Sequence, residues 1–230
     1  MQSSQPNKHI HLVSTFSEFI HFEFKDHINA IGWHRKLQGN FQEIVNKLLL
    51  KENVTEVSVD DLQALDLSQS GEIARKVIIE DLRSLTEYGT SPALNLIQYY
   101  DRDDELDFIS TDVYSFHVDR STIEADTILC TYYGASSDIV PNHQVEQKVL
   151  IPEVRAQLLA LYDDNEDDFD KFLSEYFFDL HYQPLENAQP FNLGIGHIWR
   201  LAVDHPHQKV LPCVHRAPIE NGEYRLLLIC

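Results

Sequence analysis

The sequence predicts an α+β fold in which a helical N-terminal part packs against an antiparallel β-barrel or β-sandwich. Two features indicate this fold. Up to about residue 90, apolar residues recur every three to four positions, as on one face of an amphipathic helix, and beyond it short β-branched and aromatic runs are separated by turn residues. The 230 residues fit a single large domain, with residues 1–90 mainly helical and residues 91–230 forming the β core.

Two amphipathic helices are expected in the N-terminal part. Residues 40–51 and residues 70–88 both carry apolar side chains at helical spacing. Ser70 can cap the second helix at its N-terminus, and Gly89 stands where a helix stop is expected. Before these helices, residues 28–33 form a short apolar run that we interpret as a strand.

Six strands are expected in the β core, each a short run of β-branched and aromatic residues. They lie at 93–99, 114–119, 127–133, 195–203, 210–216 and 224–229. Residues 153–180 interrupt the series with a helical insert, in which residues 154–162 and 169–180 have helical spacing. The insert and the N-terminal helices are the expected walls of a pocket in the barrel.

The charge of the chain argues against two classes of partner. Asp and Glu number 37 against 18 Lys and Arg, which gives a net charge of −19. This excess of carboxylate repels phosphates and anionic lipids, so neither nucleic acid nor a membrane is an expected partner. No run approaches the roughly 18 apolar residues of a spanning helix, and the first six residues lack the basic and apolar parts of a signal peptide. We therefore expect a soluble, cytoplasmic protein.

One pattern in the β core indicates a metal site. His117 and Asp119 lie at the end of an expected strand, where side chains two residues apart project to the same face. His215, on a later strand, is the candidate third ligand. Two histidines and one carboxylate form the facial triad that holds Fe(II) and leaves coordination positions open.

Arg225 follows His215 by ten residues and is the candidate for binding a carboxylate group in bidentate fashion. Three relations between the two residues are open. A five-residue loop at 218–222 would make them direct neighbours on one face of a hairpin, and a two-residue turn at 221–222 would put them on opposite faces. In the third relation, their strands belong to facing sheets and both side chains point inward.

Four neighbours are candidates for lining the pocket. Thr131 and Tyr133 are expected to share one face of the strand after the His-x-Asp segment, and we assign them with Arg225 to the binding of a cofactor. Trp199 and Arg200, on the strand before the third ligand, are candidates for the pocket wall. Strand aromatics are also common core residues, so a purely structural role is the alternative for them.

The candidate ligands have structural interpretations as well. His117 and Asp119 can be a buried pair that fixes the end of a strand, and His215 can be a core histidine bonded to a carbonyl group. The spacing alone is not specific, because His21 and Glu23 repeat it. What distinguishes the first pair is its position among strands and the order in which the other residues follow.

With His117, Asp119, His215 and Arg225 in this order, the chain resembles the Fe(II)/2-oxoglutarate-dependent dioxygenases. Their shared pattern is a His-x-Asp, a distal His and an Arg or Lys about ten residues later. More closely, the chain resembles an uncharacterised bacterial domain-of-unknown-function family, whose members carry Phe-His-x-Asp, Leu-Cys-Thr-Tyr and Val-His-Arg-Ser-Pro segments and an early Trp-Arg stretch. The matching segments are residues 116–119, 129–134, 214–218, 225–228 and 31–35.

This resemblance implies a double-stranded β-helix, that is, a jelly-roll or cupin-like barrel, with N-terminal helices and a helical insert. It implies Fe(II) on His117, Asp119 and His215 and the distal carboxylate of 2-oxoglutarate on Arg225, and hence a hydroxylase of a small-molecule or peptide substrate. Two alternatives stay open: a cupin-like metal-binding protein that does not use 2-oxoglutarate, and a non-enzymatic acidic interaction protein. The acidity of the chain favours a cationic or neutral substrate.

Overall fold

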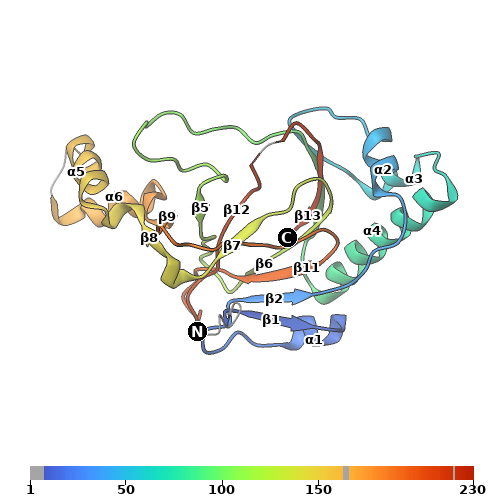
Figure 1. Cartoon of the computed structure of the whole chain (residues 1–230), viewed down its shortest axis with the longest axis horizontal. Helices are drawn as coiled ribbons and strands as arrows, with labels where there is room; N and C mark the ends of the chain where they lie inside the picture. The colour runs from blue at the N-terminus through green and yellow to red at the C-terminus, as the bar shows by residue number, and fades with distance from the viewer. Residues whose placement is uncertain (1–7, 163–165, 220) are drawn as a thin grey trace.

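The computed structural model describes residues 8–162, 166–219 and 221–230, which form a mixed α+β fold with two curled, mainly antiparallel sheets and six α-helices (Figure 1). This architecture confirms the α+β class predicted from the sequence. The first six residues, on which the expectation about a signal peptide rests, lie outside the described residues.

The larger sheet has seven strands, and its neighbours pair antiparallel except at one edge, where β1 and β2 are parallel. In spatial order they are β1 (Ile10–Val13), β2 (Ala30–Trp33), β11 (Ile198–Ala202), β6 (Asp126–Tyr133), β13 (Arg225–Ile229), β4 (Ala93–Ile97) and β3 (Val54–Glu56). The smaller, six-stranded sheet is antiparallel throughout. Its order is β10 (Phe191–Asn192), β7 (Asp138–Val140), β12 (Val214–Arg216), β5 (Phe116–His117), β9 (His181–Pro184) and β8 (Val145–Gln147).

The two sheets share an apolar core. Leu129, Trp199 and Leu227 of the larger sheet pack in one cluster with Ile139 of β7. Because side chains alternate along a strand, their neighbours point to the outer face of the larger sheet. Ile128, for example, belongs to a second cluster that the sheet shares with helices of the N-terminal part.

Four helices come from the N-terminal part and two from the insert. The first four are α1 (Phe16–His21), α2 (Phe41–Lys47), α3 (Val59–Gln63) and α4 (Gln69–Tyr88). In Figure 1 α2, α3 and α4 lie at the end of the molecule opposite the two helices of the insert, whereas α1 lies beside β1. The longest, α4, ends as predicted at Gly89, whose φ of 104° favours glycine. Its start differs from the prediction, because the side chain that caps it belongs to Ser68 and Ser70 lies inside the first turn.

The N-terminal part supplies strands as well as helices. β1, β2 and β3 come from it and include both edge strands of the larger sheet. The sequence indicated only β2, within residues 28–33. β1 and β3 are four and three residues long and contain polar residues, so neither forms the short apolar run that indicated β2.

The insert contains α5 (Pro152–Leu161) and α6 (Phe169–Glu175). The helix expected over 169–180 is wrong in its second half. Phe177 has a φ of 61°, in the left-handed region, which an α-helix cannot contain, and a 3₁₀ helix (Phe178–Leu180) then leads into β9.

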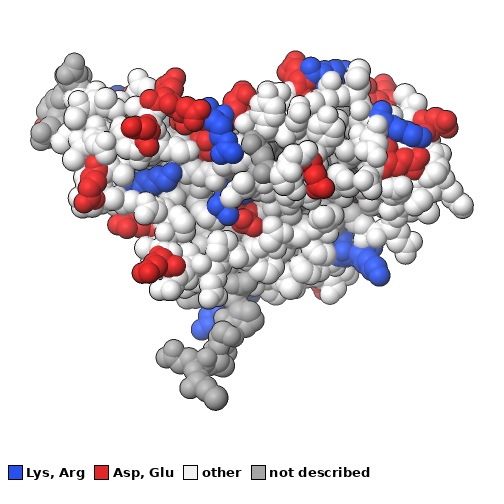
Figure 2. All heavy atoms as spheres, turned by 45° about the horizontal axis from the view of Figure 1, so that its top comes forward, with Lys and Arg blue, Asp and Glu red and all other residues white. Residues whose placement is uncertain are grey.

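The surface carries charges of both signs. Figure 2 shows acidic and basic side chains interspersed over one face of the molecule rather than gathered into a basic patch. Among the described residues, no helix is both long enough and apolar enough to cross a membrane.

An ion pair ties α4 to the outer face of the larger sheet. The Arg35 guanidinium donates two hydrogen bonds to the Asp81 carboxylate, and the Tyr132 hydroxyl on β6 donates another at 2.6 Å. Burial alone would lower the pKa of Arg35, but the hydrogen bonds and charge of Asp81 outweigh it and raise this pKa. Breaking such a pair leaves one charge buried without a partner.

The Asp81→Ala variant should therefore lower the free energy of unfolding by about 3–5 kcal/mol, because it leaves the buried Arg35 guanidinium without a charged partner. Urea unfolding measures this loss. Glu80→Ala is the matched control, since the Glu80 side chain is 70% exposed, and it should change the free energy by less than about 0.5 kcal/mol. Equal effects of the two substitutions would contradict the structural role of the pair.

Candidate metal centre

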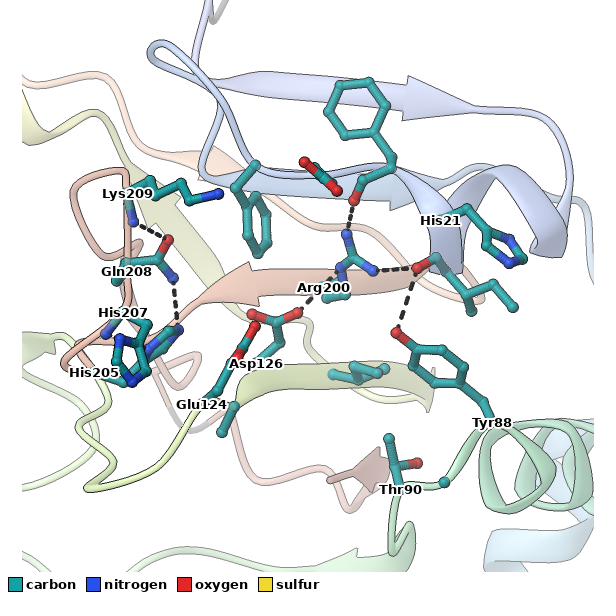
Figure 3. Close-up of a pocket in the computed structure, with 17 residues that line it drawn as sticks. His21, Tyr88, Thr90, Glu124, Asp126, Arg200, His205, His207, Gln208 and Lys209 are labelled. Atoms are coloured by element: carbon teal, nitrogen blue, oxygen red, sulfur yellow. Dashed lines mark hydrogen bonds and ion pairs between the residues drawn. The ribbon is translucent and has the colours of Figure 1, made fainter.

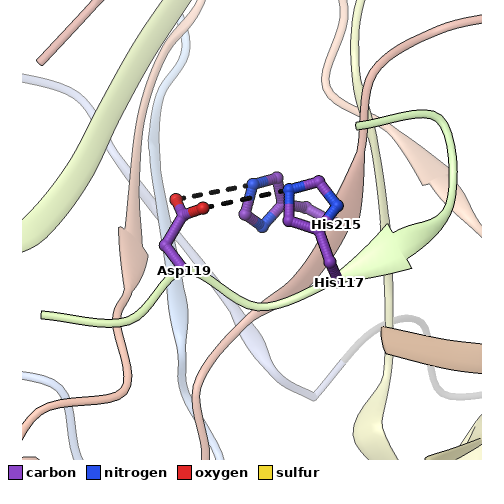
Figure 4. A group of neighbouring side chains, drawn as sticks. All are labelled: His117, Asp119 and His215. Carbon is purple, nitrogen blue, oxygen red and sulfur yellow. Dashed lines mark ion pairs between the residues drawn. The ribbon is translucent and has the colours of Figure 1, made fainter. Parts of the chain in front are cut away.

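Three side chains converge on the inner face of the smaller sheet (Figure 4). His117 ends β5, Asp119 follows two residues later, and His215 lies on β12 directly opposite His117. On its other side His215 pairs with Ile139, which belongs to the core between the sheets. One ligand atom of each residue of the triad lies within 4.8 Å of the others. The structure thus brings together all three residues that the sequence indicated as metal ligands.

Both imidazole rings are held through Nδ1. His117 Nδ1 donates to the Ser115 carbonyl at 2.8 Å, and His215 Nδ1 donates to the Cys213 carbonyl at 3.1 Å. A carbonyl oxygen only accepts, so each Nδ1 carries the ring proton and each Nε2 keeps a free lone pair. Metal-binding histidines are commonly oriented in this way.

The two imidazoles and the carboxylate of the triad do not form hydrogen bonds with one another. Nε2 of His117 lies 3.8 Å from Oδ1 of Asp119, and Nε2 of His215 lies 3.6 Å from Oδ2, both longer than hydrogen bonds. The carboxylate instead accepts a hydrogen bond from the Thr127 hydroxyl. Two free imidazole lone pairs facing a carboxylate fit a shared cation better than a structural pair, which would be hydrogen-bonded.

The surroundings of His117 and Asp119 favour the forms that bind metals. It lowers the pKa of His117 to about 4, with the neighbouring His215 ring contributing in the same direction. Burial alone would raise the pKa of Asp119, but His215, the Thr127 hydroxyl and His117 outweigh it and lower this pKa. At neutral pH His117 is therefore uncharged and Asp119 is a carboxylate, as metal ligation requires.

Arg225 lies on β13 in the opposite sheet and is only 6% exposed. Its guanidinium donates to the Thr131 hydroxyl at 3.0 Å and to the Ser137 hydroxyl at 2.8 Å. Burial lowers the pKa of Arg225, and the phenol group of Tyr100 opposes this only in part. Among the described residues its side-chain hydrogen bonds thus go to hydroxyl groups and not to a carboxylate.

Of the three relations between His215 and Arg225 that the sequence left open, the structure shows the third, in which their strands belong to facing sheets. β12 and β13 belong to different sheets, so His215 and Arg225 are not hairpin neighbours. Arg225 pairs with Ile97, a residue of the core between the sheets. Both side chains therefore point inward from facing sheets.

Two of the predicted neighbours lie elsewhere. Thr131 contacts Arg225 as expected, but Tyr133 packs against the core on the helix-covered face. The expectation that Thr131 and Tyr133 share a face is wrong, because the pairing register of β6 with β13 shifts between Leu226 and Leu227. Such an irregularity interrupts the alternation of side chains.

The assignment of Trp199 and Arg200 to one pocket is also wrong, because successive side chains on a strand point to opposite faces. Trp199 lies in the core between the sheets, where its ring nitrogen donates to the Leu193 carbonyl. Arg200 lies on the other face and borders a different cavity of about 640 Å³, close to Asp126 (Figure 3).

A smaller cavity of about 170 Å³ opens beside the triad and is bordered by His117, Asp119 and His181. His181 was not identified from the sequence as a site residue, because it directly follows residues 169–180, which have helical spacing, and not a recognisable strand. Ser137, which binds Arg225 from the other side of the interior, was not identified either. A lone serine in a polar segment carries no signal that would identify this contact.

Comparison of the chain with protein-family models, with curated proteins and with solved structures gives no match in any of the three. The functional interpretation therefore rests on the geometry of the site.

The triad should bind a divalent metal with a stoichiometry of one. His215→Ala and Asp119→Ala should each lower the Fe(II) or Co(II) affinity by at least about 100-fold, since each removes a ligand. Anaerobic titration of the metal-free protein, followed by its absorption spectrum, measures this affinity. His207→Ala, which changes an exposed histidine, should leave it unchanged. Retention of full affinity by both triad variants would exclude this site.

Metal-free protein should lose stability in mild acid. Burial lowers the pKa values of His9 and His117 to about 4 and of His181 to about 3, whereas the unfolded chain protonates these residues near pH 6.5. Below pH 6.5 the unfolded state thus binds more protons, and each histidine lowers the free energy of unfolding by up to about 1.4 kcal/mol per pH unit. Urea unfolding at pH 7.5, 6.0 and 5.0 tests this, and equal stability at all three would contradict it.

Proposed function

We propose that the protein is an Fe(II)- and 2-oxoglutarate-dependent dioxygenase. The observation that carries this proposal is the juxtaposition of two features across the interior. The smaller sheet presents His117, Asp119 and His215 with free ligand atoms, and the larger sheet presents the buried Arg225 guanidinium, bonded to hydroxyl groups. Two imidazoles and a carboxylate suit Fe(II), and a buried guanidinium suits the carboxylate of a cosubstrate.

The arrangement of the sheets supports the finer fold assignment, a double-stranded β-helix of the jelly-roll or cupin-like kind. Two facing sheets enclose a common core, and the candidate site lies between them. The N-terminal helices pack on the outer face, away from the site, so the expectation that they form walls of the pocket is wrong. Within this proposal the chain is related to the uncharacterised bacterial family that its His-x-Asp and Val-His-Arg segments resemble.

Each residue then has a defined task. When bound, iron and 2-oxoglutarate supply the oxidative chemistry that hydroxylates a C–H bond of the substrate. His117, Asp119 and His215 would hold the metal. The Ser115 and Cys213 carbonyls fix the two rings, and the hydrogen bond from the Thr127 hydroxyl orients the carboxylate.

Arg225 would bind the distal carboxylate of 2-oxoglutarate. The Thr131 and Ser137 hydroxyls hold the guanidinium in place before the anion arrives, which lowers the entropy lost on binding. The anion would in turn neutralise a cation that burial disfavours. The apolar core beside it, which includes Trp199, keeps the contact shielded from water and therefore strong.

Arg225→Ala should weaken 2-oxoglutarate binding by roughly 10- to 100-fold, since it removes charge-assisted hydrogen bonds, and should leave Fe(II) affinity within about threefold. The visible charge-transfer band of iron-chelated 2-oxoglutarate, recorded anaerobically, measures both. Arg155→Ala, in a half-exposed arginine of the insert, is the control and should behave as the unaltered protein.

The same titration separates the alternatives. Tight metal binding without the charge-transfer band would favour a cupin-like metal-binding protein that does not use 2-oxoglutarate. Absence of metal binding would favour a non-enzymatic interaction protein, in which the triad is structural. A band of unchanged strength in Arg225→Ala would leave the metal site in place and remove Arg225 from cosubstrate binding.

A further inference from the structure

Three histidines form a row across neighbouring strands of the smaller sheet. His215 on β12 pairs with His117 on β5, and His117 pairs with His181 on β9. Directly paired residues project to the same face of a sheet, so all three imidazoles face the interior. The ring centroids lie 4.5 Å apart for the first pair and 5.7 Å apart for the second. His181 thus stands next to the candidate metal ligands without belonging to the triad.

His181 has an unsatisfied polar atom. The residue is 5% exposed, and its Nδ1 has no hydrogen-bond partner among the described residues. Both neighbouring histidines of the row, by contrast, donate Nδ1 to a backbone carbonyl. A buried nitrogen without a partner is costly for the free protein, and a ligand whose binding brings a polar atom to Nδ1 recovers part of that cost.

Other polar side chains around the 170 Å³ cavity already have partners. The Thr111 hydroxyl donates to Asp103, and the Asp112 carboxylate accepts from three backbone amides. Arg120, the cation among the described lining residues, pairs with Asp179 and Asp204. His181 is therefore the side chain outside the triad that this cavity offers for hydrogen bonding to a ligand.

The cavity lies on the side of the triad away from the proposed cosubstrate. Arg225 bonds Ser137, which immediately precedes β7, and β7 flanks β12 on one side. His181 lies on β9, beyond β5 on the other side. 2-Oxoglutarate held by Arg225 would thus occupy the β7–β12 side, which leaves the β9 side for the second reactant.

The mouth of the cavity adds an apolar surface. Phe177 and Leu180, on the segment that leads into β9, border it together with His181. The Phe177 side chain is 57% exposed, and its left-handed backbone, with φ at 61°, is strained for a residue with a bulky side chain. Backbone strain of this kind concentrates at binding and active sites.

We propose that the β9 side of the triad is the substrate site, that His181 hydrogen-bonds an uncharged amide of the substrate, and that the adjoining hydrocarbon packs on Phe177 and Leu180. This inference rests on the proposed function and names the substrate class. A neutral imidazole both donates and accepts, as an amide does. In the metal-free protein, an anionic group would meet the Asp119 carboxylate without a free cation beside it, because Arg120 is already paired.

Saturation-transfer NMR on the metal-free protein tests this with phenylacetamide and phenylacetate, which have similar shapes and differ in charge. We expect the amide to bind at least about tenfold more tightly than the acid. His181→Leu should weaken amide binding about tenfold, and His181→Gln, which keeps a donor and an acceptor, should stay within about threefold. Phe177→Ala should also weaken it, whereas His207→Leu, in an exposed loop, should have no effect.

Failure of this inference is distinct from failure of the proposed function. His181→Leu should keep the Fe(II) and 2-oxoglutarate affinities of the unaltered protein, because His181 binds neither. Equal or tighter binding of phenylacetate, unchanged amide binding in His181→Leu, or no binding of either compound would overturn the inference while iron and 2-oxoglutarate still bind. If His181→Leu does not fold, His181→Gln and Phe177→Ala decide by the same criteria. Amide binding that depends on His181 in a protein without the charge-transfer band would instead overturn only the proposed dioxygenase activity.

Discussion

The pairing of β5 with β12 sets the position of the whole candidate metal centre. It places His117 opposite His215, and the strand period of two then brings Asp119 to the same face. Each ring is fixed by a carbonyl two residues earlier on its own chain, so ring orientation follows from backbone conformation. The strand on the far side of β5 extends the row to His181. A shift of one residue in this register would turn the histidine of one strand away from the interior.

The buried arginines of the larger sheet differ in what neutralises them. On the outer face, Arg200 lies 3.4 Å from Asp126 and donates to two backbone carbonyls. On the inner face, Arg225 has hydroxyl partners alone among the described residues. Burial of a cation disfavours folding unless a negative charge compensates it. Packing therefore accounts for Arg200 by itself, whereas Arg225 is better explained by an anionic ligand that arrives after folding.

Long periodic segments were predictable from the sequence, and the short strands β2, β5 and β12 were indicated within longer expected runs, whereas the other short strands were missed. α4 has twenty residues of helical spacing and β6 has eight residues of strand character, whereas β7 to β10 have two to four each. The candidate ligands were predictable because a His-x-Asp at a strand end projects both side chains to one face and a distal histidine follows on a later strand. Tyr133 and Arg200 were misplaced because a register shift and the alternation of faces depend on pairing partners. His181 had no local signal, since only its pairing with β5 brings it to the site.

The chain crosses from the smaller sheet to the larger one between β12 and β13. This crossing determines how His215 and Arg225 lie relative to each other. Were the two strands neighbours in a hairpin with a five-residue loop, both side chains would lie on one face of a single sheet and compete for the same part of a ligand. Because β12 and β13 lie in facing sheets, the imidazole and the guanidinium approach the interior from opposite walls. Under the proposed function, a molecule with a metal-chelating end and a distal carboxylate would then be held at both ends, and the β9 side of the proposed metal would stay accessible to a second reactant.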